Sequence, residues 1–195
     1  MLQHIVFTKD TNLNDLLLHA YSFRFTETPR CIQEESSIRN AVDATHREGF
    51  TNISLLTPEK YGVGVKLCAS CSFEGTGCPE IILVEDVEQC DDNALRYGAC
   101  FEVVLYQNGV NVWRHYADEH HHCSWHKRLG VEFPVDEHAI HQLSVEVGKD
   151  GLFFSVDDRK TFLRTEDLPK SFHVGITLCE GVVRFYDLKI ITSVL

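Results

Sequence analysis

The feature of this sequence that most constrains its fold is a series of short alternating segments in its second half. In residues 142–147, Leu143, Val145 and Val147 alternate with polar side chains, and residues 172–178 repeat the pattern. A period of two places the apolar side chains on one face of a β-strand. Strands that are apolar on one face bury that face against a second sheet. The sequence therefore predicts an all-β fold, a two-sheet antiparallel β-sandwich with few short helices.

Turn-forming residues divide the rest of the chain in the same way. The expected strands cover residues 52–56, 62–73, 80–87, 100–107, 110–115, 142–147, 152–157, 172–178 and 182–192. Glycine-containing turns fall between several of them, at residues 75–79, 108–109, 149–151 and 180–181. Nearer the N-terminus, residues 21–26 alternate as a strand does, whereas residues 36–46 predict one short helix or an ordered loop.

Length and composition favour one soluble domain. The chain has 195 residues, of which 44% are apolar and 24% charged, and it contains no internal repeat or linker. An all-β sandwich of this length forms a single core without disulfides or metal, so we expect one domain over residues 1–195. The net charge of -11 disfavours nucleic acid and anionic membranes as partners, because both require basic patches.

The N-terminal residues and the cysteines predict a cytoplasmic protein. Residues 1–10 lack a basic start followed by a long apolar run, and no later segment reaches the roughly 18 apolar residues of a membrane span. The spacing of the eight cysteines fits no small disulfide scaffold, so we expect free thiols in a reducing compartment. Cys68 and Cys71 form a C-x-x-C within an expected strand, where an offset of three directs them to opposite faces and disfavours zinc.

The segments between residues 60 and 195 resemble the concanavalin A-like lectin and glucanase superfamily. The matching segments are residues 97–113, with Asn108-Gly109 between strands, residues 141–147 followed by Asp150-Gly151 and 154–157, and the closing pair 173–176 and 184–190. The resemblance implies a jelly-roll sandwich whose curved sheets leave a concave groove for sugars. Fold alone does not give function.

Residues 80–85, Glu-Ile-Ile-Leu-Val-Glu, are distantly similar to the catalytic strand of laminarinase-like glucanases. That resemblance implies Glu80 as nucleophile and Glu85 as acid/base of a retaining β-glycoside hydrolase, whose two carboxyl groups lie about 5 Å apart. A bulge in the strand would be needed to bring positions five apart onto one face. The family's middle aspartate is replaced by Ile82, which puts turnover in doubt, and an ordinary apolar strand with a solvated acidic end explains the same residues.

Aromatic and polar side chains in and near the hairpin expected at residues 100–115 are candidates for sugar contacts. Sugar rings present apolar C–H faces that stack on flat side chains, while polar neighbours bind the hydroxyl groups. The candidates are Glu102, Tyr106, Trp113, Arg114, His115 and Trp125. Most aromatic residues in a sandwich belong to its core, so each of them also has a purely structural explanation.

A histidine-rich stretch, residues 120–126, offers possible metal ligands. If this stretch were helical, His122 and His126 would share a face and could hold zinc. A solvated loop explains the same composition, and the spacing fixes no third ligand. Calcium is suggested by the resemblance, with oxygens from residues 91–93 or 157–158, but the fold requires no cofactor.

Three functions therefore remain open. The leading hypothesis is a non-catalytic, lectin-like domain that binds an oligosaccharide or polysaccharide on its concave face. The alternatives are the Glu80 and Glu85 glycoside hydrolase and a protein-interaction sandwich without a sugar site. A groove filled by a loop such as residues 116–130 would favour the interaction sandwich, and a homo-oligomer is also open.

Overall fold

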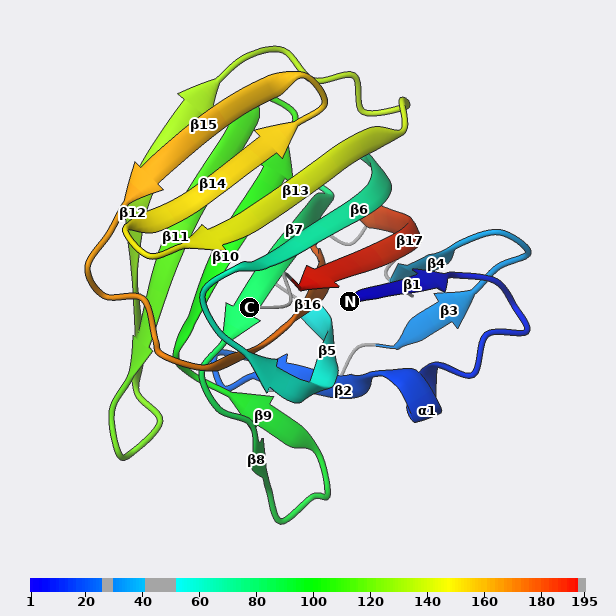
Figure 1. Cartoon of the computed structure of the whole chain (residues 1–195). Coiled ribbons are helices and arrows are strands. Elements are labelled where there is room, and N and C mark those ends of the chain that lie inside the picture. Colours follow the sequence, from blue (N-terminus) through cyan, green and yellow to red (C-terminus); the bar gives the residue numbers. More distant parts are fainter. Residues whose placement is uncertain (26–29, 41–51, 193–195) are drawn as a thin grey trace.

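Two sheets packed face to face make up the structure, a computed structural model that describes residues 1–25, 30–40 and 52–192 (Figure 1). The first sheet has the order β15-β14-β13-β6-β17-β4-β3, and β1 also pairs with β17. Its strands are β1 (Leu2–Val6), β3 (Cys31–Gln33), β4 (Ile38–Asn40), β6 (Val65–Glu74), β13 (His141–Gly148), β14 (Gly151–Val156), β15 (Arg159–Arg164) and β17 (Val182–Thr192).

The second sheet has the order β12-β11-β10-β7-β16-β5-β2-β9-β8. Its strands are β2 (Leu18–Ser22), β5 (Asn52–Tyr61), β7 (Cys78–Val84), β8 (Glu88–Gln89), β9 (Leu95–Tyr97), β10 (Cys100–Tyr106), β11 (Gly109–Ala117), β12 (Cys123–Glu132) and β16 (Phe172–Cys179). All strand pairs are antiparallel except β2 with β9. One short helix, α1 (Leu13–Leu16), is found within the described residues, so the expected all-β sandwich is confirmed.

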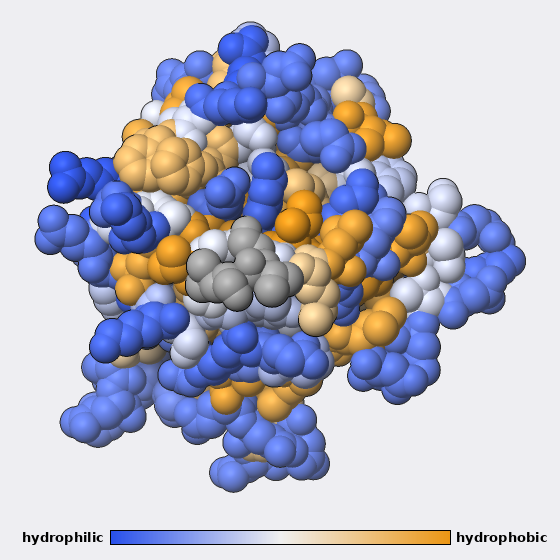
Figure 2. Space-filling view, viewed as in Figure 1, coloured by the Kyte–Doolittle hydropathy of each residue, from blue (hydrophilic) through white to orange (hydrophobic). Residues whose placement is uncertain are grey.

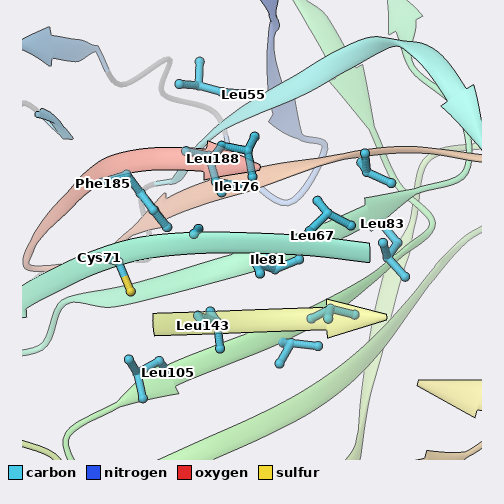
Figure 3. Close-up of a cluster of buried hydrophobic side chains, with 14 of the residues drawn as sticks. Leu55, Leu67, Cys71, Ile81, Leu83, Leu105, Leu143, Ile176, Phe185 and Leu188 are labelled. Carbon is cyan, nitrogen blue, oxygen red and sulfur yellow. The ribbon is translucent and has the colours of Figure 1, made fainter. Parts of the chain in front are cut away.

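The core lies between the two sheets and is formed by alternate residues of their strands. Leu67 and Cys71 of β6 meet Ile81 and Leu83 of β7 and Leu143 of β13 in one buried cluster (Figure 3). Cys68 is only partly buried and is outside this cluster. The prediction that Cys68 and Cys71 point to opposite faces of their strand is therefore confirmed. All eight cysteines are free thiols.

Tight crossings between the sheets join β6 to β7 and β16 to β17. A side chain at Gly181 would collide with the backbone at Gly77, so the two crossings lie against each other. The buried Asn40 holds the second crossing, because its Nδ2 donates to the carbonyl oxygens of Glu180 and Gly181, each at 2.7 Å. Its Oδ1 accepts from the Val183 amide at 3.0 Å.

Some expected elements differ from those observed. The strand expected at residues 21–26 is displaced, because β2 ends at Ser22 and residues 23–25 leave the sheet. Where a helix or loop was expected at residues 36–46, β4 forms over Ile38–Asn40, and residues 41–46 lie outside the described residues. The edge strands β12 and β15 and the short strands β1, β3, β8 and β9 were not expected from the sequence.

Polar and apolar side chains are interspersed on the face seen in Figure 2. The largest exposed apolar side chains include Trp125, Ile140 and Phe153. No helix among the described residues is long and apolar enough to cross a membrane.

Candidate functional site

The candidate site lies on the face of the second sheet that is turned away from the core, here called the concave face. Ile81 and Leu83 of β7 and Phe101 and Val103 of β10 point into the core. Because side chains alternate along a strand, the residues between and beside them point to the concave face. The concave face therefore carries Glu80 of β7, Glu102 of β10, Trp113 and His115 of β11 and Trp125 of β12.

Strand register places these side chains beside one another. Glu102 is paired with Trp113 on β11 and with Ile82 on β7. Glu80 is two positions from Ile82 on the same strand, so the two glutamates are diagonal neighbours across the β7–β10 pair. His115 is paired with Trp125, and their ring centroids are 6.5 Å apart.

One half of the concave face is closed by side chains of its own sheet. Tyr97 comes from β9, near the far edge, yet its hydroxyl group lies 2.7 Å from Ser54 Oγ on β5. Ser54 Oγ is in turn 2.8 Å from Thr177 Oγ1 on β16. Tyr97 also packs in a second buried cluster on this face, formed by Ala20, Leu56, Ile82, Val84, Tyr97 and Cys100. The half of the face over β16, β5 and β2 is therefore filled by side chains.

The segment that follows β2 reaches across to the opposite edge of the sheet. Phe23 stacks on His121, in the turn before β12, with ring centroids 3.9 Å apart. The Arg24 guanidinium lies 4.4 Å from the Trp125 ring centroid, and its NH1 is 3.3 Å from His115 Nδ1. This segment covers the middle of the face, whereas residues 116–130, considered above as a loop that could fill the groove, include most of β12 (Cys123–Glu132).

The two concave-face glutamates are almost fully removed from water. Glu80 is 4% exposed and Glu102 is 5% exposed. Burial raises the pKa of Glu80 well above its usual range, and the charge of Glu102 adds to this effect. Within the described part of the chain, Glu80 Oε2 has no hydrogen-bond partner. Buried polar atoms of this kind are uncommon and mark candidate functional sites.

Glu85 does not join Glu80. It follows β7, and its carboxylate forms an ion pair with Arg114, whose guanidinium lies 4.8 Å from the ring centroid of the core residue Phe101. The pairing of β7 is continuous with β16 over Cys78–Val84 and with β10 from Glu80 to Val84, without the bulge that would bring Glu80 and Glu85 together. Glu80 and Glu85 therefore lie on opposite faces, and Arg114 points away from the concave face.

The other expected sugar contacts lie at the open half of the face. Trp113 is partly buried, and Tyr106 is partly buried at the end of β10 opposite Gly109. Trp125 is 50% exposed. Asn111, two positions before Trp113, has a buried Oδ1 without a hydrogen-bond partner among the described residues. Glu102, Trp113, His115 and Trp125 are thus brought together, Tyr106 lies further along β10, and Arg114 is separated from them.

His122 and His126 have different surroundings in the structure. The stretch is a turn followed by a strand, not a helix. His122 Nδ1 lies 3.0 Å from Asp118 Oδ2, whereas the His126 ring packs edge-on to Tyr116. Among the described residues, three metal-binding side chains cluster elsewhere: Cys100, Glu102 and His115.

The two acidic turns considered for calcium have structural partners. Asp92 Oδ1 accepts from the Ala94 amide at 3.0 Å, and its Oδ2 lies 3.1 Å from Arg96. Asp157 Oδ1 accepts from the Gln142 amide, and its Oδ2 lies 2.9 Å from His141 Nδ1.

Three residues of the site were not identified from the sequence. Cys100 was recoverable, because the turn at Asn108 fixes the β10–β11 register and places Cys100 opposite His115. Tyr97 and Arg24 carried no such signal. Arg24 lies 91 positions before its neighbour His115, and Tyr97 lies 43 positions after its neighbour Ser54.

Comparisons with known proteins identify the fold. No family model matches the sequence, and no curated protein matches it significantly. Among solved structures, the carbohydrate-binding module CBM66 from Bacillus subtilis has a TM-score of 0.61 and 12% identity, covering 85% of this chain and 92% of that chain. The Crh5 transglycosylase has a TM-score of 0.61 and 13% identity, with coverage of 99% and 85%.

The exoplasmic/lumenal domain of VIP36, in a Ca²⁺/Man3GlcNAc-bound form, has a TM-score of 0.59 and 11% identity. It covers 98% of this chain and 89% of that chain. At such low identity these likenesses show the fold alone. The chain has a concanavalin A-like sandwich fold, which confirms the architecture expected from the sequence.

Proposed function

We propose that this protein binds an oligosaccharide or polysaccharide at the open half of its concave face, on a platform formed by Trp113 and Trp125. The observation that carries the proposal is that both tryptophans of the chain lie on this one face. They flank His115 and Glu102, and Trp125 remains half exposed.

The chemistry of the platform suits a neutral sugar. An indole ring stacks on the apolar face of a sugar ring, while nearby polar groups bind its hydroxyl groups. Lys127 is the register partner of Trp113 and supplies a donor. The closure of the other half by Tyr97 limits the site to a short stretch of sugar units.

Some structural neighbours bind carbohydrates, which supports the proposal. One is described as a carbohydrate-binding module and another as a form bound to Man3GlcNAc. Calcium enters only as an experimental condition, because the acidic turns considered for it are engaged in structural contacts. A cytoplasmic location and a homo-oligomer stay predictions of the sequence.

A glycan panel, screened with and without added calcium, tests the proposal. We expect at least one neutral glycan to bind, and Trp125→Ala to weaken binding at least about 10-fold through loss of stacking. Phe153→Ala is the matched control, because Phe153 is 51% exposed on β14 of the other sheet. A blank panel in both buffers would favour the protein-interaction sandwich instead.

Hydrolysis is the second candidate, with Glu102 in place of Glu85 as the partner of Glu80. The two glutamates face the same surface from neighbouring strands, and the raised pKa of Glu80, caused by burial and by Glu102, suits a general acid. Their burial requires the covering segment to move before substrate enters. Glu80→Gln and Glu102→Gln should each abolish release of reducing ends from a bound glycan; full activity in either variant excludes this pair.

A further inference from the structure

The β10–β11 hairpin brings a thiol, a carboxylate and an imidazole together on the concave face. Cys100 and His115 are directly paired across the two strands, and Glu102 is two positions from Cys100 on the same face. One ligand atom from each residue lies within 4.8 Å of the others. Cys100 Sγ is 3.9 Å from Glu102 Oε1, and His115 Nε2 is 2.7 Å from Glu102 Oε2.

We propose that Cys100, Glu102 and His115 form a binding site for a borderline divalent metal ion of the zinc type. Zinc combines sulfur, nitrogen and oxygen ligands at about 2.0–2.3 Å, so donors around a tetrahedral ion lie roughly 3.2–3.8 Å apart. The separations between these three donor groups bracket that range, and small rotations of side chains would bring them to it. The donor set differs from the all-oxygen set that calcium prefers.

An independent observation is that two polar groups at this point are buried without hydrogen-bond partners among the described residues. His115 Nε2 is one: it lies close to Glu102, but the arrangement does not make a hydrogen bond. The other is Glu80 Oε2, on the neighbouring strand. Both residues are more than nine-tenths buried. A bound cation would offset the cost of two neighbouring buried carboxylates.

The hairpin supplies the rigidity that such a site needs. Cys100 and Glu102 lie within the second sheet, because β10 is paired with β7 on one side and β11 on the other. Glu80 lies diagonal to Glu102 and is placed to supply a fourth ligand or to orient one. The four side chains come from three adjacent strands, so the site does not depend on a loop.

Arg24 is the neighbour that opposes the metal. Its NH1 lies 3.3 Å from His115 Nδ1, so ligation through Nε2 requires the ring proton to occupy Nδ1 and the Arg24 contact to give way. Since the guanidinium also lies over the Trp125 ring, metal binding should alter tryptophan fluorescence. Arg24→Ala should bind the metal at least as tightly as the wild-type chain.

The test uses the full chain, stripped of metal and titrated with Zn²⁺ and with Co²⁺. We expect one ion per chain, and Co²⁺ should give the charge-transfer absorption of a cobalt–thiolate bond. Cys100→Ser should remove that absorption, and Cys100→Ser, His115→Gln and Glu102→Gln should each weaken affinity at least about 10-fold. The matched controls are Cys123→Ser and His126→Gln, two substitutions on β12. Both variants should bind the metal as tightly as the wild-type chain does.

Circular dichroism identifies which variants fold, and any one of the three folded site variants decides the question. Saturable binding that is weakened in that variant, but not in the controls, supports the site. Absence of saturable binding to the wild-type chain, or unchanged binding in the folded site variants, overturns it. The readout is metal binding itself, so its result is independent of whether the protein binds sugar.

Discussion

At the scale of single residues, Glu80 is the side chain whose environment is hardest to explain by stability. It is buried beside Glu102, and one carboxylate oxygen has no hydrogen-bond partner within the described residues. A buried carboxylate that lacks a full set of partners destabilises the folded chain. Its position on the face that carries both tryptophans makes it a candidate for the proposed ligand site.

The raised pKa of Glu80 predicts how stability depends on pH. Burial and the charge of Glu102 raise the pKa of Glu80 in the folded chain, whereas the unfolded chain loses this proton near about pH 4.3. Between those two pKa values the folded state binds more protons, so the free energy of unfolding falls as pH rises. Glu80→Gln should reduce this fall and be at least as stable as the wild-type chain at neutral pH.

Urea unfolding at a series of pH values measures the effect. Glu132→Gln, on the exposed part of β12, is a control that should leave the pH dependence unchanged. A Glu80→Gln variant that is less stable than the wild-type chain at neutral pH would show that the carboxylate has stabilising partners and would contradict this account.

At the scale of elements, the β10–β11 hairpin and its neighbour β12 position most of the site. Gly109 has φ +134°, and a side chain there would collide with the backbone carbonyl oxygen of Val131 on β12. Its pairing with Tyr106 and Glu132 links the three strands. The close approach of β12 at Gly109 therefore helps to keep Trp125 beside His115.

Gly109→Ala should destabilise the chain by more than about 1 kcal/mol, because positive φ and a backbone collision act together. Gly64→Ala is the matched control: Gly64 has φ +96°, but a side chain there would meet no atom within 4 Å. The midpoints of urea unfolding should rank the wild-type chain first, Gly64→Ala second and Gly109→Ala last. Equal midpoints for the two variants would show that the contact with β12 carries little energy.

The strands that the sequence predicted and those it did not differ in how they are buried. β13 buries apolar side chains at alternate positions, and β16 is buried throughout with apolar side chains at alternate positions from Phe172 to Leu178, so their pattern is visible in the sequence. β12 is an edge strand whose residues are mostly exposed and include His126, Lys127 and Arg128. Charged residues protect such edges from pairing with other chains, and they also remove the alternation that would have revealed the strand.

Some residues of the candidate site could also be placed from the sequence, and others could not. Glu102, Trp113 and His115 could be placed together because a short hairpin fixes their register. The separation of Glu80 from Glu85 depended on whether β7 contains a bulge, which its sequence does not reveal. The cover formed by Phe23, Arg24 and Tyr97 depends on contacts between residues far apart in the chain, for which no local pattern exists.

At the scale of the whole molecule, one continuous core joins the two sheets. Residues from α1 and from strands of both sheets belong to the same buried cluster. The concave face adds a second, smaller cluster on the other side of the second sheet. This arrangement gives the second sheet buried side chains on both faces and leaves its open half as the accessible part of the concave face.

A single domain over residues 1–195 should unfold in one cooperative step. Both tryptophans report on the second sheet, whereas far-UV circular dichroism reports on both sheets. If the chain is one cooperative unit, the two signals should give coincident urea unfolding curves. Curves with separate midpoints would show that the sheets unfold independently and would contradict the single domain.

The central claim, that sugar binds at Trp113 and Trp125, is tested most directly by the two indole N–H signals of the ¹⁵N-labelled chain. The chain contains two tryptophans, so both signals belong to the proposed platform. Our account predicts that a glycan that binds shifts both indole signals in a saturable manner, whereas the backbone signals of β14 and β15 stay unchanged. A glycan that binds and leaves both indole signals in place would contradict the account.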